Sequence, residues 1–317
     1  MRVLIIGKKN FIRWPEALAE NMAKQATVSF FCVNPKTIGY AWSKWRGERY
    51  RDAYLQKQLR KRIQSFKPDA VLFVSGFFLP QSLFDEVALY PYVKKASYCG
   101  DAFGEKEEKM INCLDIVFCT DTGFIPMVEK YGGKAVYMPL CADETLFTNQ
   151  KTKKTLPPFF VGMNNPKRTE YLAAVRQRCL IYGRRWDKSK LPQHDVYNKK
   201  IRQEHQYRFV QQSIAPLNLA FSVNNVNGLN FRPFEIGACG SLIINNACPD
   251  LALCYEVGKE AIAYHTPAEF ADLIDDIVAH PDKYEKIAEA GYQRTIRDHT
   301  YTKRCRDILD ILEKLPD

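Results

Sequence analysis

The feature of this 317-residue chain that most restricts its fold is the alternation of short apolar runs with longer mixed segments. Short apolar runs bounded by polar turns are typical of buried strands, and the segments between them have the length of helices. In the first half, strands are predicted at Val3–Ile6, Thr27–Val33, Ala70–Ser75, Ala96–Tyr98, Ile116–Thr120 and Ala135–Met138. Strands that alternate with helices predict an α/β fold with a parallel sheet covered on both faces.

A second series of strand-like runs follows residue 158. Its strands are predicted at Phe159–Val161, Cys179–Tyr182, Leu217–Ser222, Leu242–Asn245 and Ala261–Tyr264. The polar, basic segment 148–158, TNQKTKKTLPP, lies between the two series and has the composition of a linker. We therefore predict Rossmann-like domains over 1–147 and 159–292, and a last helix over 293–317 that packs back on the N-terminal domain. Ligands of such sheets bind at the carboxyl ends of the strands, so we expect a cleft between the two domains.

The composition indicates the compartment and the class of partner. A net charge of +10 favours anionic partners such as phosphates, nucleic acid or an acidic membrane face. No nucleic-acid recognition motif accompanies the charge, so nucleic acid ranks below the other two. The ten cysteines include no CxxC pair and several lie in apolar runs, as expected of buried thiols in a reducing cytoplasm. The apolar run in MRVLIIGKKN is far too short for a signal sequence, and no run approaches the ~20 apolar residues of a membrane span. We expect a cytoplasmic protein with peripheral contact to an anionic membrane face.

Two Gly turns after predicted strands are candidates for binding the phosphates and base of a nucleotide. In FFVGMNNPKRTEYL, Lys167 and Arg168 begin a helix, where backbone N–H groups favour an anion. In CLIYGRRWDKS, the turn at Gly183 carries Arg184 and Trp186, a cation and an aromatic ring suited to a nucleobase. The alternatives are a solvated basic patch and, for Trp186, a core residue.

The stretch SVNNVNGLNFRPFEIGACGS is the most specific in the chain. Its loop carries Asn224, Asn225, Asn227 and Gly228. Arg232 and Glu235 follow three positions apart, so they share one face of a helix turn. A buried carboxylate is costly unless it is paired. Either Arg232 and Glu235 brace the helix start, or the cation meets a phosphate and the carboxylate accepts hydrogen bonds from ribose hydroxyls. Small residues from Gly237 to Gly240 would permit a close approach by backbone or ligand.

Asp101 is the candidate acceptor-side residue of the N-terminal half. It follows a predicted strand in ASYCGDAFG, where a sheet would present a carboxylate to a ligand. The glycines at 100 and 104 would let a substrate approach the backbone. The alternative is a turn or helix-cap residue, because Asp suits both. Neither a P-loop, a GxGxxG fingerprint nor a metal-ligand spacing of His, Cys and Asp is present.

Residues 218–304 resemble the C-terminal half of the CgeB-like glycosyltransferases of spore maturation, which belong with the GT-B superfamily and its group 1 transferases. The resemblance lies in LNLAFSVNNVNGLNFRPFEIGACGSLIIN and in the late pattern AG…HTY..R. The N-terminal half adds SYCGDAFG and DIVFCTDTGFIPMVEKYGGKAVYMPLCADETLF, so the similarity covers most of residues 95–305. It implies a GT-B fold, in which the C-terminal domain holds a nucleotide-activated sugar and the N-terminal domain holds the acceptor.

The same resemblance places Glu235 in a known sequence element, and this chain differs from that element at one position. Glu235 corresponds to the second Glu of the E-x7-E element of retaining GT-B enzymes. Eight positions earlier stands Asn227 instead of Glu. The role of a first Glu therefore cannot be carried over, and the retaining or inverting outcome stays open.

We therefore expect a metal-independent glycosyltransferase. It would move a sugar from a nucleotide-diphosphate donor, UDP by frequency among such enzymes, to a saccharide or lipid-linked acceptor of surface glycan assembly. The candidate catalytic residues are Asp101 and Glu235. The alternatives are a sugar-nucleotide epimerase of the same architecture and a nucleotide- or glycan-binding protein whose catalysis has lapsed.

Overall fold

The computed structural model describes residues 1–9, 13–221 and 225–316. The chain forms two compact units. Unit 1 contains Met1–Pro139 together with Tyr301–Asp317, and unit 2 contains Leu140–Thr300. The segment 148–158, expected to be a linker, belongs to unit 2.

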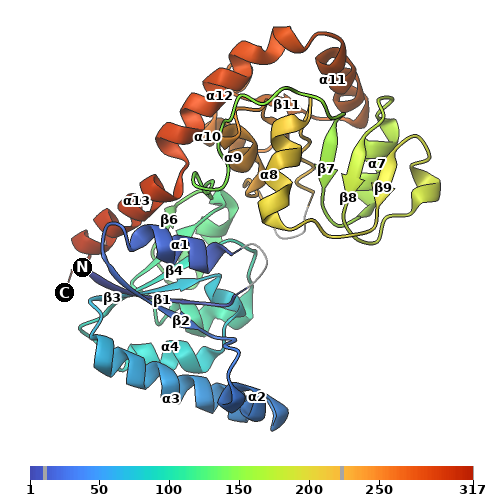
Figure 1. The fold of residues 1–317 in the computed structure, drawn as a ribbon. Helices are drawn as coiled ribbons and strands as arrows, with labels where there is room; N and C mark the ends of the chain where they lie inside the picture. Colours follow the sequence, from blue (N-terminus) through green and yellow to red (C-terminus); the bar gives the residue numbers. More distant parts are fainter. Residues whose placement is uncertain (10–12, 222–224, 317) are drawn as a thin grey trace. The chain divides into compact units, whose positions relative to one another are not determined.

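Unit 1 is built on a six-stranded sheet in which every pair of neighbours is parallel (Figure 1). Its strands are β1 (Arg2–Gly7), β2 (Thr27–Cys32), β3 (Ala70–Val74), β4 (Lys94–Cys99), β5 (Ile116–Cys119) and β6 (Ala135–Tyr137). They match the predicted runs to within a few residues. The spatial order β2-β1-β3-β4-β5-β6 reverses direction between β1 and β3, and such a switch point opens a crevice at the carboxyl ends of the strands.

The helices of unit 1 cover both faces of this sheet, α3 and α4 on one and α1 and α13 on the other (Figure 1). Their bounds are α1 (Trp14–Met22), α2 (Ile38–Trp45), α3 (Glu48–Phe66), α4 (Gln81–Ala88), α5 (Glu108–Ile111), α6 (Ile125–Lys130) and α13 (Tyr301–Lys314). The last helix packs on α1, where the Cys305 thiol lies 3.7 Å from the Leu18 carbonyl oxygen. Helix α2 was not predicted from the sequence.

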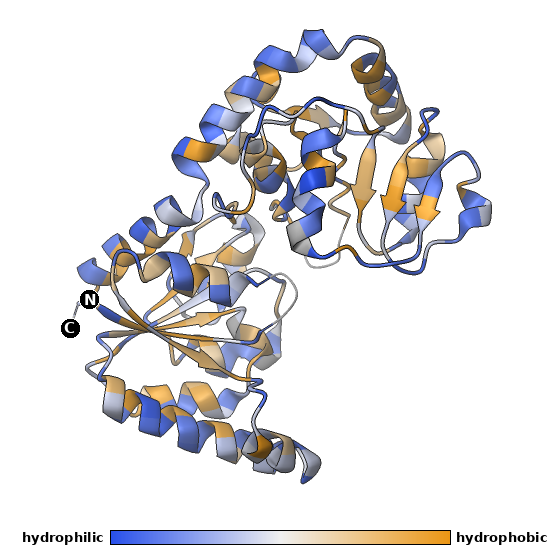
Figure 2. Ribbon diagram, in the orientation of Figure 1, coloured by the Kyte–Doolittle hydropathy of each residue, from blue (hydrophilic) through white to orange (hydrophobic). Residues whose placement is uncertain are grey.

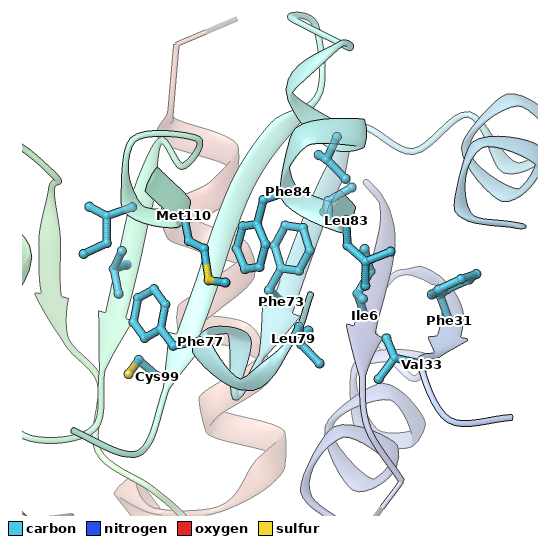
Figure 3. Close-up of a cluster of buried hydrophobic side chains, with 14 of the residues drawn as sticks. Ile6, Phe31, Val33, Phe73, Phe77, Leu79, Leu83, Phe84, Cys99 and Met110 are labelled. Carbon is cyan, nitrogen blue, oxygen red and sulfur yellow. The ribbon is translucent and has the colours of Figure 1, made fainter. Parts of the chain in front are cut away.

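The core on the α3–α4 side follows from the period-two pattern of the strands (Figure 3). Leu4 and Ile6 of β1 belong to this core, and the intervening Ile5 is buried on the other face. The rings of Phe73 from β3 and Phe84 from α4 stack with centroids 4.0 Å apart. Figure 2 shows the strands as largely apolar and the outer faces of the covering helices as largely polar.

Unit 2 contains a three-stranded and a two-stranded parallel sheet. The first is formed by β7 (Phe159–Val161), β8 (Leu180–Tyr182) and β9 (Asp195–Tyr197), the second by β10 (Ile244–Asn246) and β11 (Ile262–Tyr264). The surrounding helices are α7 (Pro166–Ala174), α8 (Gln203–Gln212), α9 (Arg232–Ala238), α10 (Leu251–Cys254), α11 (Pro267–Ala279) and α12 (Glu285–Asp298).

The strand predicted at Leu217–Ser222 is not formed as a strand over its described part, and Ser222 lies outside the described residues. Its segment, residues 213–221, still runs parallel to β7 through a bridge between Phe159 and Pro216. Towards β10 the contacts come from side chains, because the Ala220 N–H donates to Asn246 Oδ1 (3.1 Å). On the β7 side the segment has backbone hydrogen bonds. On the β10 side, asparagine side chains take the place of a backbone ladder, so the segment is not formed as a strand between the two sheets.

With this segment included, the elements of unit 2 lie in the order β9-β8-β7-segment-β10-β11. Chain order reverses between β7 and the segment, the arrangement of a dinucleotide-binding fold. The switch point of unit 2 therefore lies just beyond Val161 and Leu219.

The row of small residues in α9 is used for packing within the protein. A Cβ added to Gly237 would lie 2.2 Å from Oγ1 of the buried Thr295 in α12, and one on Gly240 would lie 2.3 Å from the Asn149 amide. α9 and α12 consequently pack at close range. In the described part of the chain, no helix is both long and apolar enough to cross a membrane.

Candidate active site at the switch point of unit 2

Arg168 ties together the two chain segments that meet at the switch point. α7 begins with Asn165 as its cap: the Arg168 N–H donates to Asn165 Oδ1 (2.8 Å), and Asn165 Nδ2 donates to the Phe221 carbonyl (2.7 Å). The Arg168 guanidinium donates through Nε to the Leu219 carbonyl (3.0 Å) and through Nη1 to the Met163 carbonyl (2.7 Å). The carboxyl ends of β7 and of segment 213–221 are thereby joined by one side chain.

A second guanidinium shares the ring on which Arg168 rests. The Cζ atoms of Arg168 and Arg232 lie 5.7 and 5.6 Å from the centroid of Phe160. Burial, together with the charge of Arg232, lowers the pKa of Arg168 to about 10. Burial also lowers the pKa of Arg232, against the opposing effect of Glu235.

Neither guanidinium forms an ion pair with a carboxylate of residues 1–9, 13–221 or 225–316. Arg232 Nε is buried and has no hydrogen-bond partner within those residues. Two neighbouring cations, partly removed from water and in direct contact with no carboxylate of the described residues, form a site that an anion would stabilise. We call these two residues the arginine pair.

Asn218 is the buried residue that positions Arg232. It is fully buried, and its Oδ1 accepts hydrogen bonds from Arg232 Nη1 and Asn230 Nδ2, both at 3.1 Å. Its side-chain amide donates to Asn245 Oδ1, and its backbone carbonyl accepts from the Tyr264 hydroxyl (2.6 Å). Asn218 was not among the residues predicted from the sequence, although an Asn within the apolar run LNLAF is a signal that could have identified it.

Glu235 lies in the first turn of α9 and is 7 % exposed. Gln206 of α8 donates from Nε2 to its Oε2 at 3.3 Å. Both Arg232 and Glu235 lie in the described part of the chain, and they form no ion pair with each other. The charge of Glu235 acts on Arg232 without direct contact, since it opposes the lowering of the Arg232 pKa by burial.

Of the other residues predicted for the nucleotide site after β7 and β8, some are exposed cations and the rest pack inside unit 2. Lys167 and Arg184 are exposed, and the Lys167 ammonium lies 3.9 Å from Glu170. A Cβ on Gly183 would lie 1.8 Å from the Gly162 carbonyl oxygen, so this turn requires glycine. Trp186 is 4 % exposed and donates from Nε1 to that same carbonyl (3.0 Å). Of its two interpretations, the structure favours a core residue.

The asparagine loop before α9 is held by its own hydrogen bonds. Asn225 Nδ2 donates to the Gly228 carbonyl (3.2 Å), and the Asp250 N–H donates to the Asn227 carbonyl (3.2 Å). Asn224 lies outside the described residues.

In unit 1, Asp101 follows the carboxyl end of β4, as predicted, and is partly exposed. The neighbouring glycine has a packing role: a Cβ on Gly100 would lie 2.7 Å from the indole ring of Trp14 in α1. Gly104 is open, because the nearest atom to a Cβ added there would be Glu107 Oε2 at 4.0 Å. Close access to the backbone near Asp101 is thus available at Gly104 and not at Gly100.

Within the described ranges, no group of three or more His, Cys, Asp and Glu side chains could hold a metal ion.

Comparison with known proteins identifies the class. Residues 167–310, which include the arginine pair and α9, match the family model of glycosyl transferase-like proteins. Across 99 % of the chain the fold is similar to that of Anabaena HepE, crystallised with UDP and glucose (TM-score 0.69, 10 % identity, 100 % of that chain). It is similar over the same share to sucrose-phosphate synthase from Thermosynechococcus elongatus (TM-score 0.71, 10 % identity, 98 % of that chain). The fold is therefore the GT-B fold that the sequence predicted, and the match over residues 167–310 supports a glycosyltransferase.

Among characterised proteins the chain is similar to the spore protein CgeB of Bacillus subtilis (strain 168). The two are 21 % identical over 267 residues, which span 76 % of this chain and 81 % of CgeB. The expected resemblance to the CgeB-like group is confirmed.

The first prediction concerns Asn218. Asn218→Ala removes the acceptor of Arg232 and leaves several buried polar groups unpaired, each at a cost of roughly 1–3 kcal/mol. The free energy of unfolding, measured by urea denaturation, should fall by at least about 2 kcal/mol. Asn225→Ala, which loses one hydrogen bond in a partly exposed loop, is the control and should change it by less than about 1 kcal/mol. Equal effects of the two variants would contradict the assignment of Asn218.

Proposed function

We propose that the protein transfers a sugar from a nucleoside-diphosphate sugar to a saccharide or lipid-linked acceptor, in the cytoplasm at an anionic membrane face, during assembly of a surface glycan. The observation that carries the proposal is the arginine pair at the switch point of unit 2. Its two cations lie where α/β sheets bind ligands, and neither forms an ion pair with a carboxylate of the described residues. A diphosphate supplies the missing negative charge.

The choice of UDP rests on the solved relatives. HepE was crystallised with UDP, with UDP and glucose, and with UDP-glucose. In transfer, negative charge builds up on the leaving diphosphate, and preorganised cations stabilise that charge without moving. Arg168 and Arg232 are fixed by hydrogen bonds to the Leu219 carbonyl and to Asn218, which makes them suited to this role without a metal ion.

Glu235 is the proposed acceptor of hydrogen bonds from the donor ribose. Its carboxylate lies one helical turn after Arg232, at the opening of α9, and it accepts a long hydrogen bond from Gln206. An ionised carboxylate has about four lone-pair sites and can accept several donors at once. This position is compatible with a nucleotide whose phosphates meet the arginine pair.

Asp101 of unit 1 is the proposed acceptor-side residue. In this role the carboxylate is the general base, which accepts the proton of the acceptor hydroxyl during transfer. If the leaving phosphate takes that proton, Asp101 orients the hydroxyl instead.

The second candidate function is a nucleotide- or glycan-binding protein without transfer activity. Asn227 in the place of a Glu is the observation that favours it, because the retaining element is incomplete. An epimerase of the same architecture has less support, since it would need carboxylates and a His facing the sugar.

Incubation with a panel of nucleotide sugars separates these functions. A transferase releases nucleoside diphosphate slowly by hydrolysis and faster with an acceptor, an epimerase interconverts the sugars, and a binding protein does neither. Thermal shifts with UDP, GDP, ADP, TDP and CMP identify the base, since a ligand at one hundred times its Kd stabilises the fold by about 2.7 kcal/mol. Absence of both a thermal shift and hydrolysis across the panel would overturn the proposal.

The second prediction separates the arginine pair from nearby exposed cations. Arg168→Gln and Arg232→Gln should each weaken UDP binding about ten- to hundredfold, because each removes a charged hydrogen bond worth roughly 1.5–3 kcal/mol. Titration calorimetry measures the effect. Lys167→Gln and Arg184→Gln remove exposed charges and serve as matched controls, with an expected loss below about fivefold. A uniform loss across all four variants would indicate general electrostatic attraction instead of a built site.

The third prediction concerns Glu235. Glu235→Ala should cost roughly 1.5–3 kcal/mol of UDP affinity by calorimetry, because a carboxylate that holds ribose hydroxyls forms charge-assisted hydrogen bonds. The variant should remain folded, with a cooperative melting transition, so that the loss appears in binding. Unchanged affinity together with a sharply lower melting temperature would assign Glu235 to the structure alone.

The fourth prediction concerns Asp101. If its carboxylate accepts the acceptor proton, Asp101→Asn lowers kcat by about 100- to 10,000-fold with donor affinity intact. If it orients the acceptor, the variant mainly raises the acceptor KM. Steady-state kinetics with varied acceptor distinguish the two, and wild-type values of both constants would make Asp101 a turn residue.

A further inference from the structure

The short helix α2 turns its apolar side to solvent. Ile38, Trp42 and Trp45 lie at positions i, i+4 and i+7 on one face and are 90 %, 57 % and 83 % exposed. The opposite face carries Ser43, which is buried, and Gly39, which packs against the ring of Tyr54 in α3. The usual amphipathic arrangement is thus inverted. Such clustering of large exposed apolar side chains marks an interaction surface.

Basic residues are concentrated around the same face. Residues 36–62 contain nine Lys or Arg and two acidic residues, most of the excess positive charge of the chain. The residues nearest the exposed face, Lys36, Lys44, Arg46 and Arg49, are themselves exposed. They form no ion pair within the described residues, whereas Arg51 and Arg60 farther along α3 are paired with Asp52 and Glu86. Exposed cations without an ion pair in the described residues therefore lie next to the apolar stripe in the sequence.

The aromatic rings beside this stripe are held in place by a cation. The Arg46 guanidinium lies 4.7 Å from the ring centroid of Trp42 and 4.2 Å from that of Tyr50, on either side of the turn at Gly47. Arg46 thereby fixes two half-exposed aromatic side chains next to one another. We call Ile38, Trp42, Trp45, Tyr50 and their four neighbouring cations the α2 face. Figure 1 shows α2 beyond the end of α3, at the margin of unit 1.

We infer that the α2 face binds an anionic lipid bilayer, with Ile38, Trp42 and Trp45 inserted at the interface and the cations on lipid phosphates. The inference deepens the proposed function and rests on it for the reason why a membrane would matter, namely a lipid-linked acceptor. Trp and Tyr rings suit the headgroup level because they are apolar with a polar edge. Cations near an acidic leaflet add attraction that salt weakens.

Charge complementarity favours a bilayer over the other occupants. A second copy of the chain would bring the same unpaired cations against themselves. A nucleic acid would satisfy the cations and could stack on the indoles, yet it offers nothing to Ile38, the most exposed apolar side chain of the face. A bilayer accommodates the aliphatic, aromatic and basic side chains of the α2 face together, as it does for interfacial helices.

The tryptophans of the chain make a direct test possible. Of the four, Trp14 and Trp186 are 5 % and 4 % exposed, so Trp42 and Trp45 dominate the solvent-sensitive fluorescence. Phosphatidylcholine vesicles that contain phosphatidylglycerol should shift the emission of the full chain to shorter wavelength and protect it from iodide. Pure phosphatidylcholine vesicles should have a much smaller effect. No shift with anionic vesicles, or an equal shift with neutral ones, overturns the inference.

Variants locate the binding surface. In vesicle sedimentation, Trp42→Ala/Trp45→Ala should lower partitioning at least about tenfold, since two large apolar side chains are lost. Lys44→Gln and Arg49→Gln should each lower it about fivefold at low salt and have little effect at high salt. Leu253→Ala/Val257→Ala, at exposed apolar positions of unit 2, is the matched control and should bind as the unchanged chain does. Unaltered melting temperatures exclude misfolding.

The competing occupants give distinct results, each of which would overturn the inference. A blue shift that grows with protein concentration in the absence of vesicles indicates a second copy. A blue shift with a single-stranded oligonucleotide that also displaces the vesicles indicates nucleic acid. Vesicle binding requires no sugar donor, and UDP calorimetry requires no membrane. The failure of this inference is therefore distinguishable from the failure of the proposed function.

Discussion

The side chain of Asn218 is the interaction on which unit 2 depends. The segment that carries it lies between two small sheets and lacks a backbone ladder on the β10 side. The hydrogen bond from the side-chain amide of Asn218 to Asn245, with that from the Tyr264 hydroxyl to the backbone carbonyl of Asn218, replaces that ladder. Because Asn218 also accepts from Arg232, the contact that joins the sheets is the contact that orients a cation of the site. Fold and binding chemistry share one buried polar group, and such networks are costly when only partly satisfied.

The arginine pair illustrates how a fold can hold charge ready for a ligand. Both guanidiniums rest on Phe160, and burial lowers the pKa of each. Backbone carbonyls at the ends of β7 and segment 213–221, together with an asparagine, satisfy much of their hydrogen bonding without cancelling their charge. Neutral acceptors hold the cations in place, so the positive potential remains available. A carboxylate in direct contact with the pair would neutralise that potential.

The strands of unit 1 were predicted well, because parallel buried strands are continuous apolar runs such as VLII and AVLFV. The prediction of a strand failed in segment 213–221, where side-chain hydrogen bonds take the place of backbone hydrogen bonds. The segment is apolar like a strand, but asparagines from distant positions in the sequence make its contacts towards β10. The prediction also missed α2, whose apolar residues face outward, against the pattern used to recognise helices. Arg168 and Arg232 were named from local motifs, and the structure brings the two together over Phe160. The part of Phe160 has no local signal, because it arises only when separate segments are brought side by side. Asn218 left one signal, a polar residue within the apolar run LNLAF.

The return of the chain to unit 1 has a consequence for its biosynthesis. Helix α13 packs on α1, and Cys305 lies against Leu18 although 287 positions separate them. During translation, the six strands of unit 1 leave the ribosome long before α13 exists, so the side of α1 that packs on α13 has no cover until that helix emerges. Unit 1 is therefore begun first and completed only after unit 2 has been made. Over that interval its partly closed core is exposed to chaperones and to aggregation, a liability of closing a domain with a helix so distant in the chain.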